Sequence, residues 1–163
     1  MKRIKVSWKV CYVLYLFTFF LVGCTRKARD IEIKADITIK ARDDANFGDV
    51  HFFVKNGLVR LVGSCPTPRS RELINQKLKS IHIIDSLKDE LIIAPVTLGT
   101  SYALKQQADS VLARYPMVSA FVSNTSIMLS GEIEISELQK LLPLIKKVFP
   151  VVDTTRLITI KTL

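Results

Sequence analysis

VHFFVKNGLVRLVG, residues 50–63, is the most clearly patterned segment of the chain and predicts a β-hairpin. Apolar residues occupy every second position on both sides of Asn56 and Gly57, as in two strands with one buried face. The Asn-Gly pair supplies the positive φ angles that a tight type I′ turn requires. Gly63 follows the second alternating run, so we expect Asn56, Gly57 and Gly63 to serve turn and sheet geometry rather than chemistry.

The segment before the hairpin, residues 30–45, fits two patterns. Isoleucines at alternating positions suit a strand, whereas Ile33, Ile37 and Ala41 recur at i, i+4 as on one face of a helix. The length favours a helix that starts with Asp30 as its N-cap. The β-branched residues weaken its helix propensity, so local evidence leaves both structures open.

A second helix and a third strand are expected after the hairpin. Residues 70–80 carry apolar side chains at helical spacing, and Leu91-Ile92-Ile93 predicts a short buried strand before Pro95. The expected order is therefore helix, hairpin, helix, strand.

The whole pattern then occurs a second time. A shift of 68 residues superimposes the apolar, turn and closing positions of the hairpin on a second set. The matched residues are Val50, Val54, Asn56, Val59, Leu61 and Gly63 with Val118, Val122, Asn124, Ile127, Leu129 and Gly131. Predicted helices over residues 100–114 and 136–148 and a strand over 157–160 complete a tandem duplication. Thr125 replaces the turn glycine, and Pro143 lies inside the last helix, which it is expected to kink.

With these motifs the chain resembles a pair of BON domains, which are small α/β modules of bacterial envelope proteins. The resemblance rests on Val-x-x-x-Val-x-Asn-Gly-x-Val-x-Leu-x-Gly at residues 50–63, followed by an Arg/Glu-rich helix start and an apolar strand. It implies that residues 30–45 are helical. It also implies an α+β fold of two tandem αββαβ domains, each a three-stranded mixed sheet covered by two helices. The implied boundaries are 30–94 for the first domain, 95–99 for a linker and 100–163 for the second domain.

The first 23 residues have the organisation of a signal peptide. Four basic residues precede an apolar run, residues 10–22, which is shorter than the about 20 residues that a membrane-spanning helix needs. Leu-Val-Gly-Cys at residues 21–24 resembles the lipobox of bacterial lipoproteins. This resemblance implies cleavage before Cys24 and acylation of Cys24 by fatty acids such as palmitate. An ordinary signal peptide or an N-terminal anchor is the alternative, and either places the remaining residues outside the cytoplasm.

Residues 24–29 are expected to form an extended, lipidated tether, whose five residues after the cysteine reach at most about 17 Å. Arg26, Lys27 and Arg29 then lie at the level of the head groups, where each adds about 1 kcal/mol of attraction to an anionic surface. An ordinary solvated tether is the alternative.

Charge and cysteine content argue against several classes of function. Four of the 24 lysines and arginines precede residue 24, which leaves 20 basic against 15 acidic residues and a net charge of +5. Without a basic run or interleaved aromatics, this charge gives no nucleic-acid signal. With Cys11 removed and Cys24 acylated, Cys65 has no disulfide partner. We expect Cys65 to be a small buried hydrophobe rather than a reactive thiol.

The sequence predicts neither an enzyme nor a metal or cofactor site. His51 and His82 are its only histidines, and neither stands in a motif for nucleophilic catalysis. Together with Cys65 they lack the ligand spacing of a zinc site. By strand parity His51 points away from the apolar stripe of its strand, so we expect it to be exposed.

The side of each predicted sheet that faces away from the helices is a candidate contact surface. Phe53 and Phe121 lie on this side at equivalent positions of the repeat. We expect these faces to dock the two copies against each other or against a partner; isolated apolar residues on a solvated sheet are the alternative. Further candidates for lipid contact are lysines of the second copy: Lys105, Lys140, Lys146 and Lys147.

The favoured function is that of a non-enzymatic lipoprotein of the outer membrane, facing the periplasm, whose modules bind phospholipid surfaces. The family resemblance implies a role in envelope integrity or osmotic-stress tolerance. Thr25, in place of an aspartate after the acylated cysteine, resembles the outer-membrane default. The alternative is an interaction scaffold that binds an envelope protein or the cell wall and uses lipid only as its tether.

Overall fold

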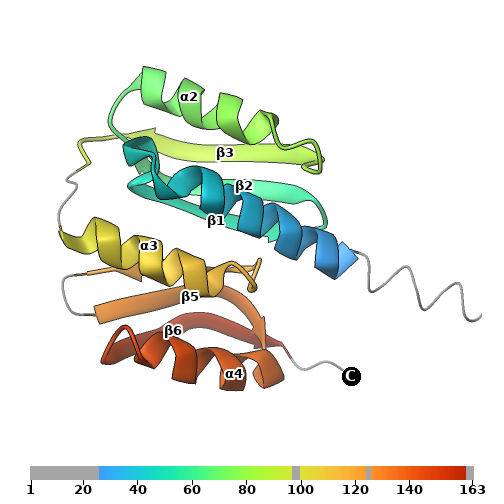
Figure 1. Cartoon of the computed structure of the whole chain (residues 1–163), viewed down its shortest axis with the longest axis vertical. Coiled ribbons are helices and arrows are strands. Elements are labelled where there is room, and N and C mark those ends of the chain that lie inside the picture. The colour runs from blue at the N-terminus through green and yellow to red at the C-terminus, as the bar shows by residue number, and fades with distance from the viewer. Residues whose placement is uncertain (1–25, 97–99, 124–125, 161–163) are drawn as a thin grey trace, which may run out of the picture.

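The computed structural model describes residues 26–96, 100–123 and 126–160 (Figure 1). The predicted signal peptide, Cys24 and the second hairpin turn at Asn124 and Thr125 lie outside these residues. Within the described part of the chain, no helix has the length and apolar character needed to cross a bilayer.

Two units follow one another along the chain, and each has the order helix, hairpin, helix, strand. The first comprises helix 26–42, a 3₁₀ turn (Ala45–Phe47), β1 (Asp49–Lys55), β2 (Leu58–Cys65), α2 (Pro68–Lys79) and β3 (Ser86–Ile93). The second comprises α3 (Thr100–Leu112), β4 (Val118–Val122), β5 (Ser126–Glu134), α4 (Ile135–Lys146) and β6 (Val151–Ile160). In each unit the first two strands are antiparallel, and the third pairs in parallel with the second. The predicted α+β fold with two three-stranded mixed sheets is confirmed.

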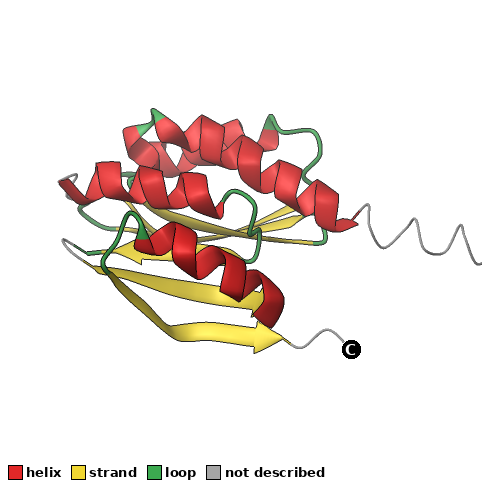
Figure 2. Cartoon of the chain, turned by 60° about the horizontal axis from the view of Figure 1, so that its bottom comes forward, coloured by secondary structure: helices red, strands yellow, loops and turns green. Residues whose placement is uncertain are grey.

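In both units the helices lie on one side of the sheet (Figure 2). Val50, Phe52 and Val54 on β1 face the helices and are fully buried, as their alternation predicts. The core of each unit lies between its helices and its sheet. Cys65 belongs to the first core and is completely buried, which confirms the expectation of a buried hydrophobe.

Helix 26–42 resolves the ambiguity before the hairpin in favour of the helical pattern. Ile33, Ile37 and Ala41 line its buried face, whereas Ile39, which the strand pattern would bury, is exposed. Its predicted start was wrong: residues 26–29 are already helical, and Asp30 lies inside the helix instead of capping it. The extended tether over residues 24–29 is wrong for the same reason, since residues 26–29 are part of the folded unit.

The repeat is matched by equivalent backbone geometry. Gly63 has φ +112° and Gly131 has φ +127°, a region that residues with a Cβ rarely adopt. A Cβ at either glycine would overlap a carbonyl oxygen, that of Asp49 for Gly63 and that of Met117 for Gly131. Both the glycines and the carbonyls that they accommodate are 68 residues apart, so one shift aligns the two backbones as well as the sequence.

Several elements extend further than the sequence predicts. β3 begins at Ser86 and β6 at Val151, because parallel pairing with the preceding strand continues beyond the apolar runs. Helix α4, predicted over residues 136–148, runs from Ile135 to Lys146 with Pro143 inside it.

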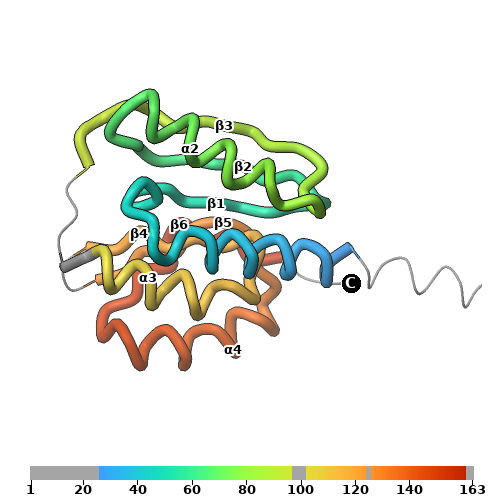
Figure 3. Tube along the Cα trace, turned by 45° about the horizontal axis from the view of Figure 1, so that its top comes forward, coloured from blue at the N-terminus to red at the C-terminus, as the bar shows by residue number. Residues whose placement is uncertain are grey.

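The two sheets meet at one edge of each (Figure 3). The edge strands there are β1 and β4, and the Val54 amide donates a hydrogen bond of 2.9 Å to the Pro116 carbonyl just before β4. We call this contact between β1 and β4, together with the helix residues packed on it, the seam.

Candidate functional site: the seam between the two units

A buried lysine from helix 26–42 joins the two sheets at the seam. Lys34 is 1% exposed, and its Nζ donates to the carbonyl of Phe52 on β1 at 2.5 Å and to that of Val118 on β4 at 3.0 Å. The same ammonium lies 4.3 Å from the centre of the Phe52 ring. Burial lowers the pKa of Lys34 to about 7, while the nearby Asp109 carboxylate opposes this shift. Lys34 therefore satisfies a carbonyl on each of two strand edges that make no continuous ladder.

Next to Lys34, helix α3 contributes a buried ion pair. Lys105 Nζ lies 2.6 Å from the Asp109 carboxylate one turn later, and Lys105 is only 6% exposed. The prediction that Lys105 contacts lipid is therefore wrong, because its charge is buried and paired inside the protein. The sequence placed it on a helix but did not show which side of that helix faces the first unit.

On the sheet side of the seam, His51 packs against Phe121. Their ring centroids are 3.9 Å apart, and His51 is 3% exposed, so the prediction of an exposed histidine is wrong. Burial lowers the pKa of His51, although Asp49, 3.7 Å away, opposes the shift. Its Nδ1 has no hydrogen-bond partner among the described residues. The His51 ring is thus held mainly as a neutral aromatic surface.

The two phenylalanines singled out from the repeat both lie at the seam. Phe53 is buried, and a Cβ at Gly131 of the second unit would lie 3.2 Å from its Cε1 atom. Phe121 stacks on His51 of the first unit. Each phenylalanine therefore contacts the other unit.

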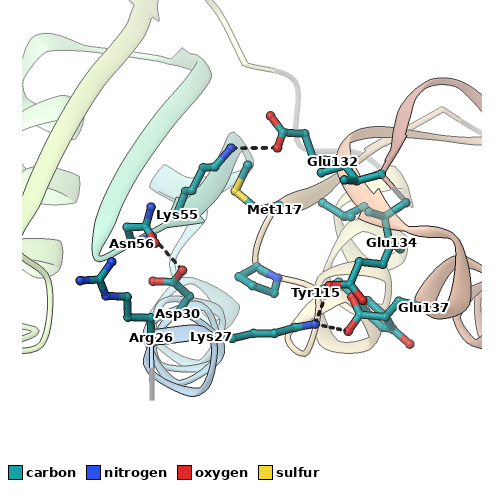
Figure 4. Close-up of a pocket in the computed structure, with 14 residues that line it drawn as sticks. Arg26, Lys27, Asp30, Lys55, Asn56, Tyr115, Met117, Glu132, Glu134 and Glu137 are labelled. Atoms are coloured by element: carbon teal, nitrogen blue, oxygen red, sulfur yellow. Dashed lines mark hydrogen bonds and ion pairs between the residues drawn. The ribbon is translucent and has the colours of Figure 1, made fainter. Parts of the chain in front are cut away.

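A cleft of about 420 Å³ opens at one end of the seam (Figure 4). Lys27 reaches across it from helix 26–42 to the carboxylates of Glu137, at 2.6 Å, and Glu134, at 3.3 Å. The hydrogen bond to Glu137 raises the pKa of Lys27. Burial raises the pKa of Tyr115 beside this pair. We call this site the polar cleft, and its lining residues are Arg26, Lys27, Asp30, Lys55, Asn56, Tyr115, Pro116, Met117, Val118, Glu132, Ile133, Glu134, Glu137 and Ile160.

A second hollow of about 370 Å³ adjoins the polar cleft and shares Lys55, Met117 and Glu132 with it. Lys55 and Glu132 form an ion pair of 2.9 Å that connects the two units where the hollows meet. The second hollow has large apolar side chains at its rim, such as Leu58 and Ile158. We call it the apolar groove, and it is lined by Phe53, Lys55, Leu58, Arg60, Met117, Ser130, Gly131, Glu132, Arg156 and Ile158.

The remaining lipid-contact candidates are distributed over several places. Arg26 lines the polar cleft, whereas Arg29 donates to the Ile83 carbonyl at 2.6 Å and to Asp85 at 2.5 Å. The charges of Lys27 and Arg29 are therefore paired within the protein. Three lysines are exposed on α4 or at its end and line neither hollow: Lys140, Lys146 and Lys147.

Sequence reasoning missed the buried polar residues of the seam. Asp30, Lys34 and Thr38 follow one another at i, i+4 along helix 26–42, and all three are buried. A polar stripe parallel to the apolar one was a visible signal, since polar residues at a constant helical spacing share one face. Arg60 and Arg156 carried no such signal, because they lie in different units.

The described residues include no group of three or more histidine, cysteine or acidic side chains placed to hold a metal ion. His51 is buried against Phe121, so it is not presented to a substrate in either hollow. The two hollows at the seam present charged and apolar side chains from both units.

No family model and no curated protein matches the chain. Among solved structures it is similar to CdsD, a structural protein of the type III secretion system of Chlamydia trachomatis, at 12% identity and a TM-score of 0.35. That match covers 78% of this chain and 91% of the other. A structure of the C-terminal domain of CdsD gives 13% identity and a TM-score of 0.32 over 74% of this chain and 62% of the other.

Proposed function

We propose that this chain is a non-enzymatic lipoprotein of the outer membrane, acylated at Cys24, whose two BON-like units act as one body on phospholipid surfaces. The single observation that supports this most is the position of the seam. Arg26 lines the polar cleft and is two residues from Cys24, a distance of at most about 7 Å between their Cα atoms. An acyl chain on Cys24 would hold this end of the seam at the membrane surface.

The anchor itself is strong under this proposal, so protein contacts serve a different purpose. Each buried CH₂ of an acyl chain contributes about 0.8 kcal/mol, and two or more chains hold a protein stably at the bilayer. Contacts between the seam and head groups then orient the two units on the membrane. This arrangement suits a role in envelope integrity or osmotic-stress tolerance.

Lipid labelling with fractionation tests the anchor. In cells given a labelled fatty acid, the wild-type chain is expected in the outer-membrane fraction with label, and Cys24→Ser is expected without label and outside that fraction. Cys65→Ser is the matched control, since Cys65 is buried in the first core and should not affect labelling. Label that persists in Cys24→Ser would contradict the acylation site.

Vesicle binding tests the lipid contact apart from the anchor. The mature chain with Cys24→Ser retains every described element, because these span residues 26–160. We expect it to co-sediment with phosphatidylglycerol-containing vesicles, to bind phosphatidylcholine vesicles less, and to lose binding as salt increases. Absence of binding to both kinds of vesicle would reject phospholipid recognition by the folded units.

The alternative is an interaction scaffold for another envelope component, and one observation favours it. Strand β6 is a ten-residue edge strand at the end of the second sheet, with exposed Val151, Ile158 and Ile160. Such an edge has free backbone groups to which a strand of a partner can add. A specific protein captured by the mature chain, without binding to either vesicle, would favour the scaffold.

A further inference from the structure

The apolar groove combines apolar side chains with cationic ones. The buried Phe53 of the first unit and the partly buried Met117 of the second both line it. At its rim Leu58 is 39% exposed and Ile158 is 64% exposed. Large apolar side chains left open to water around a hollow of this size are typical of a site for a ligand with an apolar part.

The cations of the groove are incompletely neutralised. Lys55 is paired with Glu132, but Arg60 has only a distant partner in Glu90, at 3.9 Å. Glu90 is in turn held by Lys88 at 2.6 Å. The Arg60 guanidinium lies 5.1 Å from the centre of the Phe53 ring, so it is stacked over the apolar floor.

The second arginine comes from the other unit. Arg156 on β6 lines the groove and makes no ion pair with any of the described residues. Together with Lys55 and Arg60 it gives the lining three cations against the single carboxylate of Glu132. Two guanidinium groups with unused donors match a phosphate oxygen cluster, because guanidinium presents several N–H groups in one plane.

The position of the groove indicates which class of ligand is available to it. It adjoins the polar cleft, and that cleft includes Arg26, two residues from Cys24. With Cys24 anchored, the ligand present at highest local concentration is membrane phospholipid. The residual positive charge selects the anionic species among these lipids.

We propose that the apolar groove binds one anionic phospholipid, with its phosphate held by Arg60 and Arg156 and the adjoining acyl region against the exposed side chains of Leu58 and Ile158. This inference rests on the proposed function, because it identifies the surface through which the anchored protein contacts lipid. It requires residues from both units, so neither unit contains the complete site.

Charge substitutions test the phosphate contact in the mature chain carrying Cys24→Ser. Arg60→Gln and Arg156→Gln should each weaken binding to phosphatidylglycerol vesicles about five-fold, and the double substitution about thirty-fold. Arg69→Gln is the matched control, since Arg69 is an exposed arginine on α2, on the helix side of the first sheet. Its effect should be at most about two-fold. Circular dichroism of each variant checks that the fold is unchanged.

A fluorescent probe tests the apolar contact. The single tryptophan of the chain is Trp8, within the predicted signal peptide, so the mature chain has none. Ile158→Trp places one probe at the groove, and Leu144→Trp places another at an exposed apolar position on α4. Phosphatidylglycerol vesicles should shift the emission of the first probe to shorter wavelength and leave the second unchanged. Inorganic phosphate should produce no shift.

The outcomes separate this inference from the proposed function. Suppose that the parent chain binds vesicles strongly but Arg60→Gln and Arg69→Gln weaken binding equally. This result would reject the groove and leave phospholipid recognition intact. An emission shift at Leu144→Trp rather than at Ile158→Trp would lead to the same conclusion. Equal competition by inorganic phosphate would show a site for free anions and also rejects the lipid assignment. If the parent chain binds no vesicle, the proposed function and the groove assignment both fail.

Discussion

Lys34 connects the two sheets from a completely buried position at the seam. It leaves water completely and gains two carbonyl partners, one from each sheet. Burying an ammonium group carries a large free-energy cost, which these hydrogen bonds offset in part. A lowered pKa is the measurable sign of that cost.

The lowered pKa predicts a specific dependence of stability on pH. An unfolded chain keeps the Lys34 proton until about pH 10.5, whereas the folded protein releases it near pH 7. Between these values the unfolded chain binds more protons at this site, so the free energy of unfolding rises with pH. This site should make the free energy of unfolding rise by up to about 1.4 kcal/mol per pH unit. We expect Lys34→Met to lack this contribution when urea unfolding is followed between about pH 7 and about pH 10.

Lys79→Met is the control for this measurement, because Lys79 is an exposed lysine on α2. Its variant should keep the wild-type slope of stability against pH. If Lys34→Met also keeps that slope, then Lys34 retains its proton in the folded protein across this range.

At the scale of elements, helix 26–42 contacts both units through an apolar face, a polar face and its C-terminal end. Its apolar face fills the first core through Ile33 and Ile37. Its polar stripe of Asp30, Lys34 and Thr38 points toward the hairpin turn and the seam. Near its C-terminus, the Arg42 carbonyl accepts a hydrogen bond of 3.2 Å from the Tyr102 hydroxyl on α3. One helix therefore fixes the first hairpin and the second unit at the same time.

Asp30, the first residue of this polar stripe, allows a test of how the helix holds the hairpin turn. The Asp30 carboxylate accepts hydrogen bonds of 2.8 Å from the backbone amides of Asn56 and Gly57, which lie in the turn between β1 and β2. Hydrogen bonds to a charged group contribute about 1.5–3 kcal/mol each, and the Gly57 amide is buried. Asp30→Ala should therefore lower the free energy of unfolding by about 2–4 kcal/mol in urea titrations.

Glu32→Ala is the appropriate comparison, because Glu32 lies on the same helix, is exposed, and has no hydrogen-bonded partner among the described residues. It should change the free energy of unfolding by less than about 0.5 kcal/mol. A similar loss in both variants would show that helix charge, rather than the clamp on the hairpin turn, is responsible.

At the scale of the whole molecule, the seam makes two repeated units into one body. Its contacts are of different kinds: the Val54 hydrogen bond, the Lys34 bridge, the ring contact of His51 with Phe121 and two exposed ion-pair sites. Exposed ion pairs contribute little, about 0–1 kcal/mol each, so the buried contacts carry most of the coupling.

A double-mutant cycle measures that coupling across the seam. His51→Ala and Phe121→Ala, alone and together, should give a coupling free energy of about 0.5–1.5 kcal/mol in unfolding experiments, as expected for a packed ring pair. The same cycle with His82→Ala in place of His51→Ala should give none, since His82 is exposed in the first unit. Zero coupling for both cycles would mean that the rings touch without stabilising the seam.

The sequence was sufficient for the hairpins, the repeat and the α+β class. Strand alternation, helical spacing and the Asn56-Gly57 turn are imposed by the geometry of each element on its own residues, so they are visible in a short window. Even there, the start of helix 26–42 was missed, because three of residues 26–29 are charged and their partners, such as Glu137 for Lys27, are far away in sequence.

What the sequence by itself determined is therefore the two units, down to their buried faces and the glycines at Gly63 and Gly131. Only the tertiary structure decided that β1 and β4 meet, that His51 and Lys105 are buried, and that Lys34 bridges two sheets. The physical reason is separation along the chain: Lys34 and Val118 are 84 residues apart. Each side of the seam has the local pattern of an ordinary helix or strand. Whether its residues are buried or exposed depends on which surface lies opposite.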